Sequence, residues 1–251
     1  MGHRKGVIRL GWRGGMLALS LHAAAAAAGC AQAPPRAASG DSGFPRAARP
    51  VARIVSPAWA SEGERDAAGE ATRVMDLLRI VPGTRVADIG AGSGYYTVRL
   101  ARRLGPAATI YAEDVDPAYL ATLGSRLQRA GFPSVSTVLG TSGDPRLPAA
   151  SVDVAILSHM YHEIADPYAF LARLAPAIAP GGRVGIVDLD RDTDLHGTPP
   201  ALLRCELEAV GYRQVGFEML TPAEGYLAIF EAPERTPAPA AITPCHAGEA
   251  K

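Results

Sequence analysis

The sequence predicts an α/β protein with a doubly wound, mostly parallel sheet that ends in an antiparallel hairpin. Short apolar runs alternate with amphipathic helical stretches between about residues 61 and 231, as in successive βαβ units. A glycine-rich turn follows the first apolar run, which is where such folds place a ligand. The last two runs, residues 212–220 and 226–231, are joined by a short turn, so they are expected to pair antiparallel.

Length and charge set the first limits on function. The chain has 251 residues with 25 basic and 25 acidic side chains, which suits one α/β domain with extensions. Residues 1–29 contain four basic side chains and no acidic one, so without them 21 basic residues face 25 acidic ones, a net charge of −4. An acidic chain of this kind gives no reason to expect a nucleic-acid partner.

Residues 1–29 have the layout of a secretory signal peptide: a basic start, an apolar stretch and small residues at the end. The apolar stretch is short for a membrane span. The end of the segment, Ala27-Ala28-Gly29-Cys30, resembles a bacterial lipobox, which implies a lipidated Cys30 and attachment to a membrane. Ala27 stands where leucine is usual, so ordinary cleavage remains open. A disordered leader of biased composition and an uncleaved anchor are further alternatives.

Three further segments are expected after the leader. Residues 30–57 predict a flexible Pro/Ala-rich tether, residues 58–232 the folded domain, and residues 233–251 a disordered tail. An exported chain would allow Cys205 and Cys245 to pair, but one lies in an expected helix and the other in the tail. This placement favours two unpaired thiols.

The glycine turn is the centre of the predicted site. A strand at residues 85–89 contains Asp88, and Gly90, Gly92 and Gly94 follow at alternate positions before a helix. Glycine tolerates positive φ, and without a Cβ it lets a ligand lie on the main chain. The turn therefore predicts a ligand site, with a turn that only serves close packing as the alternative.

The spacing of these glycines distinguishes between ligands. A dinucleotide fingerprint requires glycine where this chain has Tyr95, and a phosphate-binding loop requires a lysine, which is missing nearby. The remaining pattern, Asp-x-Gly-x-Gly-x-Gly, resembles motif I of the class I S-adenosylmethionine-dependent methyltransferases. The resemblance implies that the glycine backbone lies against the methionine part of S-adenosylmethionine. It also implies that Asp88 helps to orient the amino group of this cofactor.

A second acidic position strengthens this interpretation. The strand at residues 108–113 is followed by Asp114, and an acid there binds ribose hydroxyls in doubly wound folds. Glu113 is the second choice for this contact. Asp116 is expected to cap the next helix, which then begins at Pro117.

The loop after the strand at residues 135–139 is where the family usually places an acidic or polar residue against adenine. Many relatives have Asp where this chain has Thr141. Asp144 is therefore expected either to reach the adenine amino group or to cap the turn at Pro145. The backbone amide of Ser142 is a further candidate for cofactor binding.

The strand at residues 152–157 is expected to be buried on both faces, and residues 158–163 beyond it face the methyl group and the acceptor. Tyr161 and His162 are the catalytic candidates, either orienting a substrate or accepting a proton, and buried wall residues are the alternative. His159 lies near His162, but no further His or Cys is spaced to complete a metal site. No metal is therefore expected.

The final elements complete the resemblance. Pro180-Gly181-Gly182 before the strand at residues 183–189 and the closing hairpin both recur in the family, so a class I methyltransferase-like Rossmann fold is implied over residues 61–231. Asp188, near the end of that strand, is expected to line the acceptor pocket or to cap the sheet edge. A helix is expected at residues 201–210.

The sequence thus predicts methyl transfer from S-adenosylmethionine to an unidentified small molecule. Such transfer depends on positioning donor and acceptor, so a general base is optional. The leader predicts a periplasmic or cell-envelope lipoprotein, with an inner-membrane anchored or cytoplasmic protein as the alternative, whereas the donor is a cytoplasmic metabolite. An exported, non-enzymatic binding module with the same fold is therefore a second hypothesis. A nicotinamide-dependent reductase is a weaker third, since Tyr95 interrupts the glycine spacing it requires.

Overall fold

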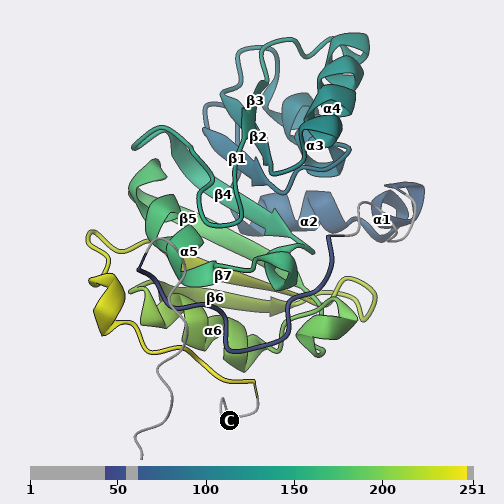
Figure 1. The fold of residues 1–251 in the computed structure, drawn as a ribbon. Helices are drawn as coiled ribbons and strands as arrows, with labels where there is room; N and C mark the ends of the chain where they lie inside the picture. Colours follow the sequence, from purple (N-terminus) through teal and green to yellow (C-terminus); the bar gives the residue numbers. More distant parts are fainter. Residues whose placement is uncertain (1–42, 55–61, 248–251) are drawn as a thin grey trace, which may run out of the picture. The chain divides into compact units, whose positions relative to one another are not determined.

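Seven strands form one sheet in the order β3-β2-β1-β4-β5-β7-β6 (Figure 1). The computed structural model describes residues 43–54 and 62–247. The strands are β1 Val86–Ile89, β2 Ile110–Asp114, β3 Ser136–Leu139, β4 Val152–Ser158, β5 Ile178–Asp188, β6 Arg213–Met219 and β7 Tyr226–Glu231. The α-helices are α1 Glu62–Ala68, α2 Glu70–Leu77, α3 Tyr95–Leu104, α4 Pro117–Ala130, α5 Pro167–Leu174 and α6 Pro200–Ala209. Short 3₁₀ turns are η1 Tyr161–Glu163, η2 Ala175–Ala177, η3 Thr193–Leu195 and η4 Pro239–Ala241.

Strands β1 to β5 pair in parallel, and β7 pairs antiparallel with both β5 and β6. This topology confirms the predicted doubly wound fold and its closing antiparallel hairpin. Strand β5 begins at Ile178, five residues earlier than predicted, and its pairing with β4 shifts register between Val152 and Val154. The Pro-Gly-Gly sequence, residues 180–182, therefore lies inside the strand, at this irregularity.

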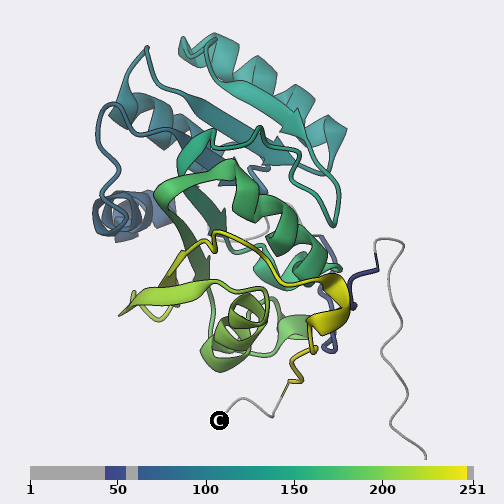
Figure 2. The same ribbon diagram turned by 90° about the vertical axis from the view of Figure 1, so that its left-hand side faces the viewer.

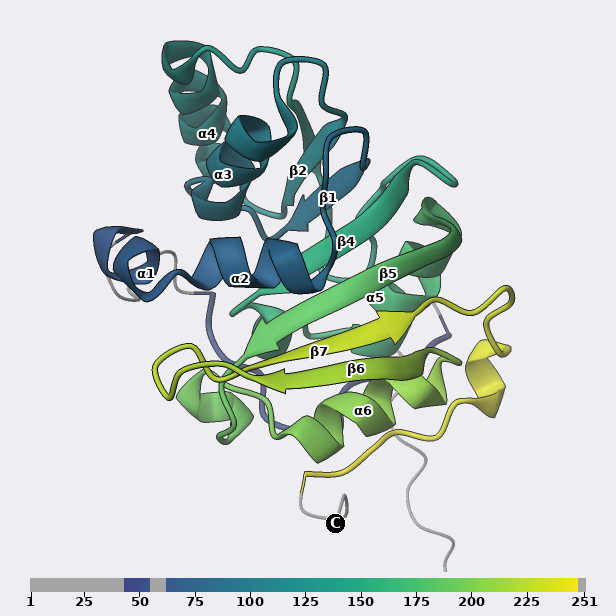
Figure 3. The same cartoon turned by 180° about the vertical axis from the view of Figure 1, so that it is seen from behind.

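Helices cover both faces of the sheet, as Figures 1 and 3 show from opposite sides. Ala87 and Ile89 of β1 pack into a core with α5 and α6, whereas Val86 packs into a core with α2 and α3. This alternation follows from the two-residue period of a strand. Because both faces are covered, the carboxyl ends of the parallel strands are the place left for a ligand.

The segment after β7 packs against the domain, which corrects two expectations. Figure 2 shows it in yellow as it runs back toward residues 43–54, which are called the N-terminal segment below. A disulfide joins Cys245 to Cys205 of α6, and the Cys245 N–H donates to the Tyr168 hydroxyl at 2.7 Å. Unpaired thiols were therefore the wrong interpretation, and a disordered tail does not describe residues 233–247. The Pro/Ala-rich composition predicted disorder, but Ile242 and Cys245 are buried and anchor this segment to the domain.

Residues 43–54 also pack against the domain, so the predicted tether is wrong for this part of residues 30–57. Arg49 and Ala52 are buried, and the Ala52 N–H donates to the His162 carbonyl at 3.1 Å. The buried guanidinium of Arg49 anchors this segment. The prediction considered only large apolar residues, which the segment largely lacks. The predicted signal peptide, residues 1–29, and Cys30 lie outside the described residues. Within the described ranges, none of the helices has the length and apolar character needed to span a bilayer.

Candidate functional site

A pocket opens where the carboxyl ends of β1, β2 and β4 meet, and it measures about 970 Å³ including its open mouth. Four chain segments at this edge contribute to its lining: the glycine turn at residues 90–93, residues 113–115 at the end of β2, residues 141–142 after β3, and residues 158–160 with Glu163 at and beyond the end of β4. Ligands bind at this edge in open parallel sheets. The pocket is therefore the candidate functional site.

The glycine turn has the backbone conformation that its sequence predicts. Gly90, Gly92 and Gly94 have φ values of 66°, 52° and 90°, which side chains rarely tolerate. A Cβ on Gly90 would lie 2.8 Å from Cγ of Met160, and one on Gly94 would lie 2.3 Å from Cδ1 of Leu123. Gly90 and Gly92 line the pocket, while Gly94 opens α3 and faces α4.

Asp114 connects the glycine turn to β2. Its Oδ2 accepts the Gly92 N–H at 2.8 Å, and its Oδ1 accepts the Asp116 N–H at 2.9 Å. Asp114 is 6% exposed and lines the pocket, as a ribose-binding acid would. Asp116 accepts the Ala118 N–H at 2.7 Å and caps α4, which confirms its predicted role.

Glu113 is a buried acid in the pocket wall. Its side chain lies beneath the glycine turn, with Oε2 3.5 Å from the Gly90 nitrogen. Burial, with a smaller contribution from the charge on Asp114, raises the pKa of Glu113 to about 8. Its Oε1 has no hydrogen-bond partner among the described residues. Glu113 is therefore largely protonated at neutral pH and has unused hydrogen-bonding capacity at the pocket.

Asp88 faces away from the pocket. Its carboxylate is 3% exposed and accepts the Thr97 hydroxyl at 2.5 Å, and burial raises its pKa to about 6. Residues two apart on a strand share a face, so Asp88 lies on the α2–α3 side together with Val86. The carboxylate thus holds α3 against β1, and the predicted contact with the cofactor amino group has no support in its position.

The loop after β3 contributes Thr141 and Ser142 to the pocket, but not Asp144. The Asp144 carboxylate accepts the Arg146 N–H at 2.8 Å, and its backbone pairs with Thr141. Asp144 thus caps the turn, which was one of the two predicted roles. Ser142 remains a candidate for cofactor binding.

The segment after β4 presents different residues to the pocket from those predicted. Tyr161 is fully buried, with its hydroxyl donating to Glu206 Oε2 at 2.8 Å, and His162 is fully buried with Nδ1 3.0 Å from Asp188 Oδ1. Neither lines the pocket, so the structure gives no support to a catalytic role for them. The 3₁₀ turn η1 directs both inward, and His159 and Glu163 line the pocket instead.

Asp188 is also buried rather than exposed to the pocket. Its carboxylate accepts the Thr198 hydroxyl at 2.7 Å and the Leu189 N–H at 2.9 Å, in addition to the contact with His162. The expectation that it lines the acceptor pocket is therefore wrong. The side chain instead binds together the end of β5, the loop before α6 and η1.

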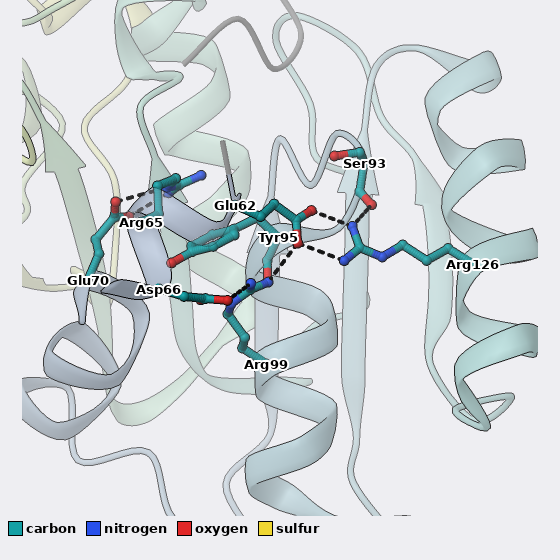
Figure 4. A network of polar contacts seen from close by, with 8 residues as sticks. All are labelled: Glu62, Arg65, Asp66, Glu70, Ser93, Tyr95, Arg99 and Arg126. Carbon is teal, nitrogen blue, oxygen red and sulfur yellow. Dashed lines mark hydrogen bonds and ion pairs between the residues drawn. The ribbon is translucent and has the colours of Figure 1, made fainter. Parts of the chain in front are cut away.

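One wall of the pocket comes from α1, and the sequence did not predict that this helix reaches the pocket. Figure 4 shows the ring of Tyr95 between two guanidinium groups, with Cζ of Arg65 3.7 Å and Cζ of Arg99 3.8 Å from its centroid. Arg65 and Tyr95 both line the pocket. They are thirty positions apart in sequence, and no local pattern signals that they meet.

Glu70 of α2 fixes this wall. Its carboxylate accepts hydrogen bonds from Arg65 Nε and from the Tyr96 hydroxyl, each at 2.9 Å, and His159 Nε2 lies 3.7 Å away. Burial would raise the pKa of Glu70, but His159 and Arg65 together lower it to about 2. Glu70 is therefore ionised throughout the neutral range and holds two pocket residues in place.

Comparison with known proteins finds similarity in the central part of the chain. Residues 87–186 match a methyltransferase domain. The matched residues include the glycine turn, the two acids at the end of β2 and the segment after β4. Nocamycin O-methyltransferase of Saccharothrix syringae is 36% identical over 117 residues, covering 46% of this chain and 41% of that protein.

Protein-L-isoaspartate O-methyltransferase of Aeropyrum pernix is 31% identical over 145 residues, covering 55% of this chain and 53% of that protein. The chain thus spans about half the length of the curated relatives it matches. The structure of a SAM-dependent methyltransferase from Aquifex aeolicus aligns with a TM-score of 0.58 at 18% identity, covering 69% of this chain and 98% of that one.

The fold alone does not determine the reaction. The [4+2]-cyclase SpnF aligns with a TM-score of 0.56 at 18% identity, covering 70% of this chain and 68% of that one. Likeness at this level shows a shared fold. The activity must therefore be argued from the residues of the pocket.

Proposed function

We propose that the chain is an S-adenosylmethionine-dependent methyltransferase that acts on a small-molecule acceptor. The observation that carries the proposal is that one pocket joins the glycine turn, Asp114 and the segment after β4. A methyltransferase requires this arrangement, because the donor site and the acceptor site must share the space in which the methyl group moves.

The pocket residues fit the proposed cofactor. Each carboxylate oxygen of Asp114 accepts one backbone N–H and can accept a second hydrogen bond, so both have capacity for ribose hydroxyls. Glu113 lines the same pocket, and its buried Oε1 has no hydrogen-bond partner in the described chain. The glycine backbone at Gly90 and Gly92 allows close approach.

The acceptor side of the pocket is the wall after β4. Bound S-adenosylmethionine supplies a methyl group activated by the adjacent positive sulfur. The chain then has to orient the acceptor for in-line attack and exclude water. Ser158, His159 and Glu163 are the polar residues that line this wall, and we assign the positioning of the acceptor to them. They replace Tyr161 and His162 in that role.

Calorimetric titration of the full chain with S-adenosylmethionine tests the proposal. Asp114→Asn and Asp116→Asn form a matched pair, since the change is the same and the positions are two residues apart. Asp114→Asn should weaken binding by about ten-fold or more, because a charged acceptor of hydrogen bonds is lost. Asp116→Asn should bind like the wild type, since Asn also caps helices.

Absence of binding at millimolar cofactor would overturn the proposal. Equal affinities for the two variants would show that Asp114 does not contact the ligand. If binding is confirmed, release of S-adenosylhomocysteine with candidate acceptors separates an enzyme from a protein that only binds. No release with any acceptor class would favour the binding-module hypothesis.

We further propose that the protein is exported to an oxidising compartment. The disulfide between Cys205 and Cys245 supports this location, because such bonds persist outside the reducing cytosol. Alkylation of free thiols in intact cells, followed by denaturation, measures the fraction of each cysteine that is oxidised. Fully reduced cysteines in living cells would contradict export.

Attachment through Cys30 is the finer part of this proposal. The lipobox-like sequence implies a lipid anchor, and wild-type protein should then sediment with membranes. Cys30→Ser should release it into the soluble periplasmic fraction. Cys205→Ser provides the matched control, since it removes a cysteine of the disulfide and leaves the proposed anchor in place. Equal sedimentation of wild type and Cys30→Ser would exclude lipidation.

A further inference from the structure

Three potential metal ligands from two separate segments meet beside the pocket. His162 and Glu163 belong to η1, and His196 follows η3, more than thirty residues later in the chain. One ligand atom of each lies within 4.8 Å of those of the other two. The rings of His162 and His196 are 5.4 Å apart, edge to face.

The N-terminal segment holds these two turns together. The Ala52 N–H donates to the His162 carbonyl at 3.1 Å, and the Thr193 hydroxyl of η3 donates to the Pro50 carbonyl at 2.7 Å. Both bonds come from Pro50 and Ala52, two residues apart in the segment that the buried Arg49 anchors. The relative position of η1 and η3 is therefore fixed by the fold.

His162 is oriented as a metal ligand is. Its Nδ1 lies 3.0 Å from the Asp188 carboxylate, which orients the ring and leaves Nε2 as the nitrogen available to a metal ion. Asp188 is itself fixed by hydrogen bonds from Thr198 and Leu189. His162 Nε2 is buried and has no hydrogen-bond partner in the part of the chain described. A carboxylate behind the ring and an unsatisfied nitrogen in front of it are characteristic of metal-binding histidines.

The donor set selects the kind of ion. Two imidazole nitrogens and one carboxylate suit Zn²⁺ and similar divalent transition metals, whereas Mg²⁺ and Ca²⁺ prefer all-oxygen sites. Three protein ligands leave at least one coordination position open. Since Glu163 also lines the pocket, the site borders the space assigned to the acceptor.

We propose that His162, Glu163 and His196 bind a divalent transition metal ion, with Zn²⁺ as the representative ion. The ion neutralises Glu163 and satisfies the buried nitrogen of His162. Its open position adjoins the acceptor side of the pocket, where an oxygen or sulfur atom of a substrate can occupy it. The metal site does not depend on the proposed cofactor.

Calorimetric titration with Zn²⁺ tests the site, using full-length protein stripped with chelator and kept free of reductant so that the disulfide stays intact. We expect one tight site per chain and no comparable binding of Mg²⁺. His196→Asn and Glu163→Gln should each lower the Zn²⁺ affinity by at least about ten-fold. His196 has a φ of 60°, which asparagine tolerates, so this variant should keep its fold.

His246→Asn is the matched control, because it makes the same substitution at an exposed position far along the chain. It should bind Zn²⁺ like the wild type. Unfolding temperatures of the metal-free variants show whether they fold, and Zn²⁺ should raise the unfolding temperature of wild type and His246→Asn by linkage.

Wild-type Zn²⁺ affinity weaker than about 100 µM would overturn the site, since structural and catalytic zinc sites bind far more tightly. Unchanged affinity in both His196→Asn and Glu163→Gln, or equal binding of Mg²⁺, would also overturn it. The S-adenosylmethionine titration is read separately. If the chain binds S-adenosylmethionine but does not bind Zn²⁺, only the metal site is refuted. If it binds Zn²⁺ but does not bind S-adenosylmethionine, only the proposed function is refuted.

Discussion

The Arg49 guanidinium lies 3.0 Å from the Glu206 carboxylate, measured from Nε to Oε1, with both side chains fully buried. Glu206 also accepts the Tyr161 hydroxyl, and Arg49 donates to the backbone carbonyls of Tyr161 and His162 at 3.3 Å each. This ion pair therefore joins the N-terminal segment, η1 and α6. It supports the turn that presents Glu163 to the pocket.

Arg49→Ala should destabilise the protein by about 3 to 5 kcal/mol, because it leaves the Glu206 carboxylate buried without a counter-charge. Urea unfolding at neutral pH measures this loss. The paired replacement of Arg49→Met with Glu206→Leu should recover only part of it, since the apolar side chains need no partner but the buried Tyr161 hydroxyl loses its acceptor. A loss below about 1 kcal/mol for the single variant would mean that residues 43–54 do not anchor the fold.

Replacing both Cys205 and Cys245 with serine should lower the free energy of unfolding by about 3 to 4 kcal/mol. The bond closes a loop with a sequence separation of 40, and removing it restores freedom to the unfolded chain. Reduction of the wild type should have the same effect, while Cys30→Ser should have none. Thiol titration of the full, unprocessed chain under denaturing conditions should find Cys30 alone, and three reactive thiols would contradict the disulfide.

The pKa of Glu113, raised to about 8 from an ordinary 4.5, makes stability fall as the pH rises. Between these values the folded protein retains a proton that the unfolded chain has released, so deprotonation favours unfolding. Glu113→Gln should abolish this decline. The free energy of unfolding of Glu113→Gln should exceed that of the wild type by about 2 to 4 kcal/mol near pH 9 and equal it near pH 5.

Glu208→Gln is the control for that comparison, since Glu208 is exposed on α6 and should show the wild-type pH dependence. Urea unfolding at a series of pH values measures both variants. Parallel curves for Glu113→Gln and wild type would show that Glu113 is not held protonated.

Glu70 makes stability depend on pH in the opposite direction. Its pKa is lowered from 4.5 to about 2, so its ionised form stabilises the fold above the unfolded value and loses that effect as the pH falls toward 2. Glu70→Gln should cost about 2 to 3 kcal/mol at neutral pH. The difference from wild type, followed by urea unfolding, should shrink between about pH 5 and pH 2. A constant difference across this range would mean that the charge is not responsible.

The sequence predicted those features whose residues are contiguous. The strand, the three glycines and the next acid follow one another in a fixed order, and sheet topology brings Gly92 and Asp114 together. Likewise, the short turn at residues 221–225 predicted the pairing of β6 with β7. Such patterns are local, so a single sequence carries them.

Contacts between distant segments could not be predicted in this way. His196 reaches His162, and Arg65 reaches Tyr95, through turns whose geometry no spacing rule specifies. The direction of Tyr161 depends on the tight 3₁₀ turn at η1, which a run of polar residues does not reveal. Sequence reasoning therefore located the pocket, whereas its catalytic candidates Tyr161 and His162 lie buried outside the pocket lining.

The position of β7 between β5 and β6 also constrains the order in which the chain can fold. Among the described strands, β6 hydrogen-bonds only to β7, which follows it in sequence. Because the chain emerges from its amino end, β6 therefore appears before β7, the strand with which it pairs. The parallel part of the sheet, with its glycine turn, can assemble during synthesis, but its antiparallel edge must wait until residues 226–231 have emerged.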